Sequence, residues 1–214
     1  MKRISSYLVH SSKKPEVYLV RFLKKLLGVF LKREKLCHMA LAGGKTPIEL
    51  YRKLSKENLP WHKVKFYLGD ERYVPLASAL SNYKVIRESL GDRARVVFFK
   101  TEMPPEECAI DYSFQLPERL HIALLGVGSD GHTASLFPST ECKEVSPKVC
   151  ISQDPEGILR LSLKEDYLKS SCVVIFFLKG EEKRRALEAM LKGENIPAGR
   201  VKGVLGTYIF TDLL

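Results

Sequence analysis

The sequence predicts an α/β protein with a doubly wound, mostly parallel sheet and helices on both faces. Short apolar runs alternate with amphipathic segments along the chain, a pattern typical of βα units. The apolar runs are continuous, as expected of strands buried on both faces of a parallel sheet. No repeat, low-complexity tract or long linker interrupts the pattern, so we expect residues 1–214 to form a single domain.

The first half of the chain alternates helices and strands. Apolar residues at helical spacing predict an amphipathic helix over residues 15–35. The apolar run 37–42 predicts a strand that breaks into a glycine turn, and a helical pattern resumes after the turn. The same alternation predicts, in order, a strand over 64–68, a helix over 81–90, a strand over 96–99 and a helix from 104 to about 116.

The second half continues the alternation. A buried strand over 121–125 ends in a glycine-rich turn. Further strands are predicted over 158–163, 173–178 and 205–210, with a helix over 181–191. Residues 140–155 have the weakest periodicity, so we expect an irregular loop there.

The charge balance favours a small anionic ligand. The chain has 35 Lys and Arg against 25 Asp and Glu, a net charge of +10. These basic residues are spread along the helices without a zinc finger, an aromatic–basic RNA-binding motif or a long basic tract, so we expect no nucleic-acid partner. Positive potential also steers small anions into a cleft.

The apolar segments indicate no membrane partner. The longest uninterrupted apolar stretch, Cys172–Leu178, is far shorter than the roughly 18 residues that suggest a membrane span. The N-terminus also lacks the apolar region and small-residue cleavage site of a signal peptide. We therefore expect a cytoplasmic protein, and a monomer, although the sequence excludes no oligomer.

The five cysteines form no C-x-x-C pair. This argues against a zinc site and against a secreted disulfide framework. We expect the cysteines to be reduced and structural. A bridge between Cys142 and Cys150 stays open as an alternative if the source is a hyperthermophile.

The first candidate site segment is the glycine turn after the strand at 37–42. Gly43 and Gly44 allow a tight turn that presents N–H groups, and Thr46 adds a hydroxyl, so an anion fits there. A plain strand-to-helix turn has the same composition. Nucleotide binding is disfavoured, because the first glycine of a Walker motif would fall at Met39 and no G-x-G-x-x-G motif is present.

The second segment follows the strand at 64–68. The planar guanidinium of Arg72 can hold a phosphate or carboxylate through two bonds, and we expect Asp70 to orient it. Glu71 is equally consistent with a surface charge. In isolation, the whole segment also fits a solvated loop.

The third segment follows the strand at 121–125. Asp130 and His132 lie two residues apart in a glycine turn, where burial for packing alone is not expected. Imidazole suits general-base chemistry at neutral pH, and an aspartate can fix its tautomer. Because no G-x-S-x-G motif is present, an activated water is favoured over a covalent serine. The carboxyl ends of parallel strands meet in one crevice, so the three segments should converge.

Three segments resemble the 6-phosphogluconolactonase family: ALAGGKTPIELYRKL, VKFYLGDERYVPLASALSNYKVIRESL and HIALLGVGSDGHTASLFP. The segments 160–163 and 177–183 extend the resemblance, which runs from about residue 38 to 192. It implies a Rossmann-like fold shared with glucosamine-6-phosphate deaminases and ribose-5-phosphate isomerases. It also implies hydrolysis of 6-phospho-D-glucono-1,5-lactone to 6-phospho-D-gluconate in the oxidative pentose phosphate pathway, without a metal or an organic cofactor.

The resemblance assigns roles to particular residues. His132 matches the general base and Asp130 its partner. Positions matching substrate or phosphate contacts are Gly43, Gly44, Thr46, Arg72, Lys183 and, more weakly, Arg160. We add Asp70, and Lys45, which stands where the family commonly has serine and brings a further positive charge. Oxyanion donors are placed only loosely, at N–H groups of residues 43 and 44 or 128 to 131.

Two other functions compete with the lactonase hypothesis. A sugar-phosphate isomerase or a glucosamine-6-phosphate deaminase on the same fold also carries a G-x-G-x-D-G-H segment, whereas the surrounding GDERYVP, SNY and GHTASLFP favour the lactonase. A non-catalytic sugar-phosphate sensor would usually carry a DNA-binding helix-turn-helix, and the chain leaves no room for one.

Besides Lys45, two further departures from the family pattern are expected: a short helix before His121 and a poor match after Lys192.

Overall fold

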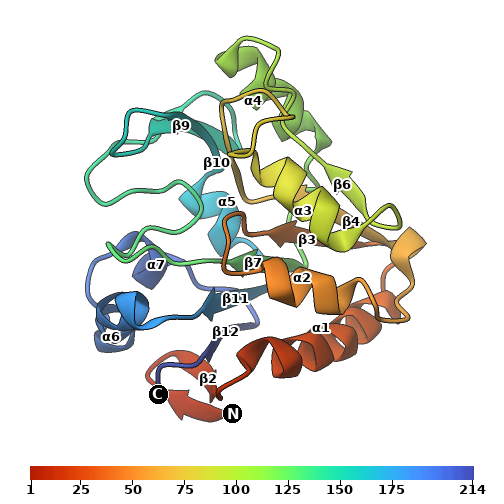
Figure 1. Cartoon of the computed structure of the whole chain (residues 1–214), viewed down its shortest axis with the longest axis vertical. Coiled ribbons are helices and arrows are strands. Elements are labelled where there is room, and N and C mark those ends of the chain that lie inside the picture. The colour runs from red at the N-terminus through yellow and green to blue at the C-terminus, as the bar shows by residue number, and fades with distance from the viewer.

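A central eight-stranded sheet dominates the computed structural model, which describes residues 1–214 (Figure 1). Its strand order is β1-β2-β12-β11-β7-β3-β4-β6, and every neighbouring pair is parallel except β1 with β2. The strands are β1 (Lys2–Ile4), β2 (Tyr7–Ser11), β3 (Cys37–Leu41), β4 (Val64–Leu68), β6 (Arg95–Val97), β7 (Ile122–Leu125), β11 (Val173–Leu178) and β12 (Gly206–Thr211). The predicted α/β fold with a mostly parallel sheet is confirmed.

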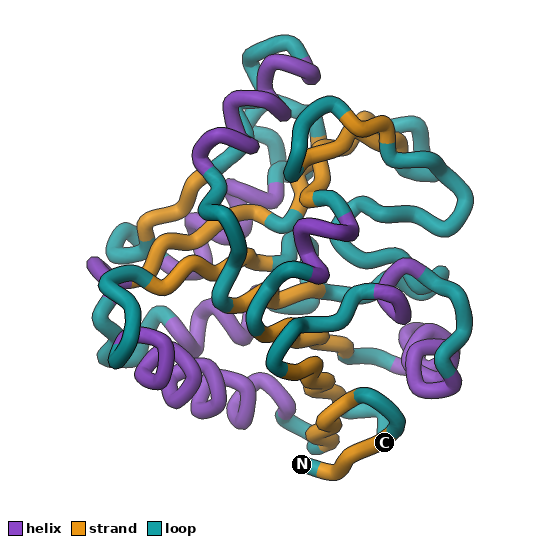
Figure 2. Tube along the Cα trace, turned by 180° about the vertical axis from the view of Figure 1, so that it is seen from behind, coloured by secondary structure: helices purple, strands orange, loops and turns teal.

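Helices cover both faces of this sheet. They are α1 (Pro15–Leu31), α2 (Ile48–Leu54), α3 (Asn82–Leu90), α4 (Pro105–Gln115), α5 (Glu165–Lys169), α6 (Arg184–Lys192) and α7 (Pro197–Arg200), with short 3-10 turns at Trp61–Lys63 (η1) and Glu181–Lys183 (η2). Helices α1, α2 and α3 pack side by side (Figure 1). Seen from behind, α5 lies in front of the sheet, α7 lies at its side next to α6, and the two chain ends lie close together (Figure 2). None of the helices combines the length and the apolar character needed to cross a bilayer.

The inner strands carry the core. All six residues of β11 and all four of β7 are buried, which explains their continuous apolar sequences. Burial of such side chains is worth about 1.5–3 kcal/mol each. The parallel arrangement then brings the carboxyl ends of β3, β4, β7 and β11 to one edge of the sheet, where the polar segments begin.

A second, antiparallel sheet lies beside that edge. It contains β5 (Asp70–Arg72), β10 (Leu159–Leu163), β9 (Val149–Gln153) and β8 (Lys143–Glu144), in that order. The predicted strand at 158–163 therefore pairs outside the main sheet. The prediction of an irregular loop over 140–155 is wrong, because β9 is buried between β10 and α4. Strand β9 pairs with its sequence neighbours β8 and β10 and packs against the more distant α4, tertiary contacts that local periodicity does not reveal.

A disulfide joins Cys142 to Cys150, with 5.5 Å between the Cα atoms. The expectation that every cysteine is reduced is therefore wrong for this pair, while Cys37, Cys108 and Cys172 are free and buried. The bridge ties the segment that follows the glycine-rich turn to the buried strand β9.

Reduction of this bridge is expected to lower the free energy of unfolding by about 2.5 kcal/mol, from the chain-entropy relation for a loop of its length. The bridged residues are 8 apart in sequence. The check is a thermal melt with and without dithiothreitol. Cys142→Ser should melt at the same temperature as the dithiothreitol-treated wild type, and its melting temperature should not depend on the reductant. An identical melting temperature for the wild type in both conditions would contradict this prediction.

Two stacked histidines lie at the amino ends of β3 and β7. The backbone N–H of His38 donates to His121 Nδ1 at 3.0 Å, and the rings lie 5.5 Å apart. Burial lowers the pKa of both imidazoles. As pH falls, these two histidines are protonated in the unfolded chain before they are protonated in the folded protein. The free energy of unfolding should therefore decrease as pH falls through about 6.5, the ordinary histidine pKa.

The measurement is urea unfolding between pH 8 and pH 5. His121→Asn should show a smaller loss of stability in this window than the wild type. His62→Asn, at an exposed position, serves as the control and should follow the wild-type curve. If the stability of all three proteins depended equally on pH, the histidine pair would not be the source of the pH dependence.

Candidate active site

A cavity of about 440 Å³ opens at the carboxyl ends of β3, β4, β7 and β11. Nine predicted site residues line it: Gly43, Gly44, Lys45, Thr46, Asp70, Arg72, His132, Arg160 and Lys183. The tenth, Asp130, reaches the cavity through its contact with His132. The structure thus brings together segments that are up to about 140 positions apart in sequence, as the crevice rule for open α/β sheets requires.

His132 and Asp130 form a direct pair. His132 Nδ1 lies 2.7 Å from Asp130 Oδ1, which also accepts the backbone N–H of His132 at 3.1 Å. A carboxylate at this position selects the tautomer with its proton on Nδ1. Nε2 is then the unprotonated nitrogen, and it makes no hydrogen bond within the protein. The imidazole can therefore act as a base through Nε2 while the carboxylate stabilises the imidazolium that forms.

The turn that carries His132 depends on glycine. A Cβ at Gly128 would lie 2.1 Å from His132 Nδ1, so only glycine leaves room for the ring. Thr133 Oγ1 donates to the carbonyl of Gly126 at 2.8 Å, and Ser135 N donates to Ser162 Oγ at 3.1 Å. The second bond anchors the turn to β10 of the antiparallel sheet.

The segment after Lys192 supports the same turn from the other side. The N–H of Ala198 in α7 donates to the carbonyl of Gly131 at 3.0 Å. The side chain of Ile196 packs against Gly131, whose φ of +88° lies in the left-handed region. The segment after Lys192 is therefore a support for the His132 turn.

Gly131→Ala is expected to destabilise the protein by about 1–3 kcal/mol and to lower kcat. The new Cβ would lie 2.8 Å from Ile196 Cδ1 and 3.0 Å from its Cβ, so the turn must shift in addition to the backbone strain. Gly193→Ala is the matched control, because Gly193 also has a positive φ, +76°, but a Cβ there meets no atom within 4 Å. Thermal melts should show a loss of stability from backbone strain in both variants. Steady-state kinetics should show a loss of kcat only in Gly131→Ala. Equal kcat values would contradict the role of this contact.

The cations of the cavity differ in how they are held. Lys45 and Lys183 form no ion pair, so their charges are free for a ligand. Arg160 donates from Nε and Nη2 to Asp154 Oδ2 at 3.0 and 2.7 Å, and this pair is largely buried. Its guanidinium therefore supports the β9–β10 turn. Nη1 makes no bond within the protein, and Arg160 lines the cavity.

Arg72 is oriented differently from the sequence-based expectation. Its Nη1 donates to Asn82 Oδ1 and to the carbonyl of Leu80, both at 2.9 Å, and it makes no bond to Asp70. The Asp70 carboxylate instead accepts Ser135 Oγ at 2.7 Å and Asn82 Nδ2 at 3.3 Å. The expectation that Asp70 orients Arg72 directly is wrong, because Asn82 lies between them.

Glu71 is no surface charge. It is completely buried, and burial raises the pKa of its carboxyl, against the opposing effect of three backbone N–H donors. These donors belong to Arg72, Asn82 and Tyr83. The surface interpretation failed because it considered only the position of Glu71 in a polar segment.

Sequence reasoning did not assign Lys179, which also lines the cavity. Its Nζ lies 3.0 Å from Glu16 Oε2 and 3.6 Å from Glu49 Oε2. Burial lowers the pKa of Lys179, but the hydrogen bond to Glu16 and the nearby carboxylate charges together outweigh burial, so the pKa is raised. Glu16 is 2% exposed and 163 positions away in sequence, so no local signal marks this pair. Lys179 therefore joins α1 to the end of β11.

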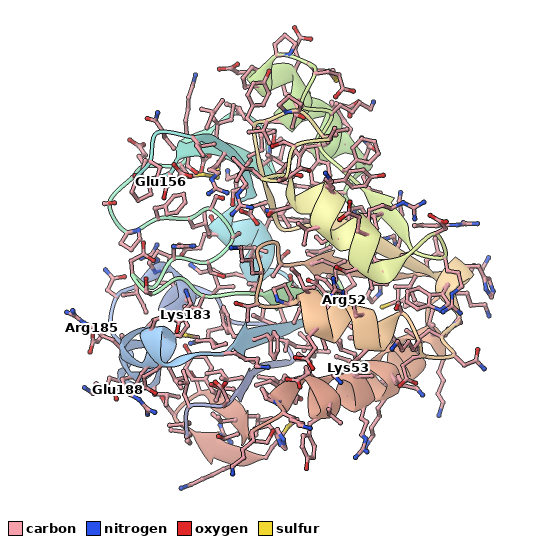
Figure 3. The ribbon with its side chains drawn as sticks, in the orientation of Figure 1. Arg52, Lys53, Glu156, Lys183, Arg185 and Glu188 are labelled. Atoms are coloured by element: carbon pink, nitrogen blue, oxygen red, sulfur yellow. A yellow bond between two sulfur atoms is a disulfide. The ribbon has the colours of Figure 1, made fainter.

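Different elements approach the cavity (Figure 3). Glu156 comes from the turn between β9 and β10, and Lys183 is the last residue of η2, directly before α6; both line the cavity. Arg185 and Glu188, on α6, are exposed and lie outside the cavity lining. No group of three His, Cys, Asp or Glu side chains is arranged to hold a metal ion.

Residues 14–209 match the family described as glucosamine-6-phosphate isomerases/6-phosphogluconolactonase. The chain belongs to this family. Because the match extends to residue 209, the expectation of a poor match after Lys192 is wrong. A 6-phosphogluconolactonase of Thermotoga maritima is 33% identical over 205 residues, covering 90% of this chain and 92% of the relative. One from Helicobacter pylori strain J99 is 32% identical and covers 84% of this chain and 82% of the relative.

Solved structures agree with this assignment. The crystal structure of 6-phosphogluconolactonase from Thermotoga maritima superposes with a TM-score of 0.87 at 30% identity, covering 96% of this chain and 98% of that one. A 6-phosphogluconolactonase from Shewanella baltica gives a TM-score of 0.86 at 22% identity, with coverage of 98% and 99%. At that lower identity, the likeness concerns the fold alone.

Proposed function

We propose that this protein hydrolyses 6-phospho-D-glucono-1,5-lactone to 6-phospho-D-gluconate, a step of the oxidative pentose phosphate pathway. The observation that carries the proposal is the His132–Asp130 pair, held at 2.7 Å, in a cavity that also contains the free cations Lys45 and Lys183. A base that activates water and cations that bind a phosphate are the two groups that this reaction needs. The relatives with this activity in their names support the same conclusion.

In the proposed mechanism, His132 Nε2 removes a proton from a water molecule that attacks the lactone carbonyl. The tetrahedral intermediate then collapses, the bond from the carbonyl carbon to the ring oxygen breaks, and the proton on the imidazolium passes to that oxygen. Asp130 stabilises the imidazolium in between. The carboxylic acid and the free hydroxyl are the products, so no further reactant is required.

The developing oxyanion requires hydrogen-bond donors. The N–H groups of Gly128 and Gly131 already donate within their own turn, at 2.8 and 3.0 Å. Ser129 and Asp130 do not line the cavity, whereas Gly43 and Gly44 do, so the turn after β3 is the better source. We assign the oxyanion to the N–H groups of Gly43 and Gly44, of which Gly44 makes only a long bond of 3.3 Å to Asn82.

The phosphate is assigned to Arg72, Lys183 and Lys45, with Arg160 at its edge. Thr46 and Asp70 complete the lining as hydrogen-bonding groups. Binding a phosphate remote from the carbonyl positions the ring for attack, so part of its binding energy is expressed in kcat. We further propose that residues 1–214 act as a single-domain cytoplasmic monomer, with neither a nucleic-acid nor a membrane partner. Size-exclusion chromatography with light scattering tests the monomer.

The decisive assay uses freshly prepared 6-phosphogluconolactone, corrected for spontaneous hydrolysis, beside ribose 5-phosphate and glucosamine 6-phosphate. We expect turnover of the lactone alone. Turnover of either sugar phosphate without turnover of the lactone would replace the lactonase by an isomerase or a deaminase. Binding of all three without any turnover would favour a sensor.

A further inference from the structure

We propose that Asn82 is a positioning residue that aims Arg72 at the phosphate and fixes the glycine turn after β3. The inference rests on the proposed function, since it concerns how the same cavity recognises a phosphorylated lactone. Asn82 is the first residue of α3, is 2% exposed and lines the cavity.

The carboxamide of Asn82 joins the polar segments that follow β3 and β4. Its Oδ1 accepts from Arg72 Nη1 at 2.9 Å and from the N–H of Gly44 at 3.3 Å. Its Nδ2 donates to the carbonyl and to Oδ1 of Asp70, at 3.0 and 3.3 Å. One side of the group must accept and the other must donate, a combination that an amide provides and a carboxylate or an apolar side chain does not.

The glycine at 43 belongs to the same unit. A Cβ there would lie 2.1 Å from Asn82 Cγ and 2.2 Å from both terminal atoms of the amide. The amide therefore occupies the space of a side chain at position 43. Gly43 is needed as much for this contact as for the turn itself, and the turn cannot move without moving Asn82.

Glu71 fixes the backbone from which Asn82 projects. Its carboxylate accepts the N–H groups of Asn82 at 2.7 Å, of Tyr83 at 2.8 Å and of Arg72 at 2.8 Å. It also accepts Ser81 Oγ at 3.1 Å. A single buried carboxylate thus holds the start of α3 and the backbone of Arg72 in one frame. The backbone at Asn82 and at Arg72 is thus held in place, and with it the hydrogen bond between their side chains.

This frame determines which edge of Arg72 is free. Nη1 is engaged by Asn82 Oδ1 and the carbonyl of Leu80, whereas Nε and Nη2 have no partner in the protein. Two parallel N–H donors along one edge are the arrangement that binds a phosphate through two bonds. Without Asn82 the guanidinium loses one of its two fixed contacts, and this edge is no longer held toward the ligand.

The test is a double-mutant cycle between Asn82 and Arg72, read by calorimetric binding of 6-phosphogluconate and of gluconate. Asn82→Ala should weaken 6-phosphogluconate binding by about tenfold, consistent with loss of one bond to a charged group. The loss should be severalfold larger than for gluconate. In an Arg72→Ala background, Asn82→Ala should cause little further loss of the preference for the phosphorylated ligand, because the part of its effect that concerns the phosphate passes through the guanidinium.

Asn82→Asp provides a variant of the same shape in case Asn82→Ala does not fold. Its carboxylate would pair with Arg72 and face Asp70, so it should also reduce binding of the phosphorylated ligand more than that of gluconate. Asn58→Ala, at an exposed amide outside the cavity, is the control and should bind both ligands as the wild type does. Thermal melts of every variant separate loss of binding from loss of folding.

Equal losses for the two ligands, or losses that multiply in the double variant, would overturn the inference and leave the lactonase assignment standing. A wild-type protein that neither binds 6-phosphogluconate nor hydrolyses the lactone would overturn both. The binding measurement and the turnover measurement therefore separate the two failures.

Discussion

Replacing His132 with alanine is expected to lower kcat by about a hundred- to ten-thousandfold, the usual range for loss of a general base. The side chain is partly exposed at the cavity, with 33% of its surface accessible, so its removal should leave the melting temperature almost unchanged. Steady-state kinetics on 6-phosphogluconolactone and a thermal melt are the measurements. The affinity for 6-phosphogluconate should change much less than kcat, because His132 acts on water rather than on the phosphate.

Two further variants test the assignment of roles. Asp130→Asn should cost less than His132→Ala, because the imidazole keeps its basic nitrogen and loses only the carboxylate that orients it. The exposed His62, outside the cavity, provides the control: His62→Ala should have wild-type kinetics. A His132→Asn variant with near-normal kcat would remove His132 from the mechanism.

The main sheet could be predicted from the sequence because its strands are encoded locally. The run Val173–Leu178 is buried at every position, so its composition alone marks a strand covered on both sides. The antiparallel sheet is encoded less evenly: its strand β10 could be predicted from sequence, whereas β5 could not. Strand β5 has only three residues, Asp70–Arg72, and all are charged. Its order comes from pairing with β10, about 90 positions further along the chain.

The same distinction holds in the candidate site. Asp130 and His132 are two residues apart in a glycine turn, so their pairing could be anticipated from sequence. The function of Glu71 could not, since its carboxylate is explained mainly by the N–H groups of a helix that begins eleven residues later. Asn82 was visible as a helix start, but its bond to Arg72 depends on how α3 packs against β5.

Arg72→Ala is expected to raise KM for the phosphorylated lactone by about ten- to a hundredfold. A hydrogen bond to a charged group contributes roughly 1.5–3 kcal/mol, which corresponds to that range in affinity. The value of kcat should also fall, to the extent that phosphate binding positions the ring. Unphosphorylated gluconolactone has no phosphate to lose, so its slow hydrolysis should change far less. Kinetics on both lactones are the measurement.

Lys183→Ala should show the same selectivity, because its ammonium lines the cavity without a carboxylate partner. Arg185→Ala is the matched control, since it removes a cation two residues further along the chain but outside the cavity (Figure 3). A general loss of positive potential would affect the Lys183 and Arg185 variants alike, whereas phosphate recognition affects only the first. If Arg72→Ala and Lys183→Ala impair both lactones equally, or neither, these residues do not bind the phosphate. Lys45 and Arg160 would then be the next cations to test, because both line the same cavity.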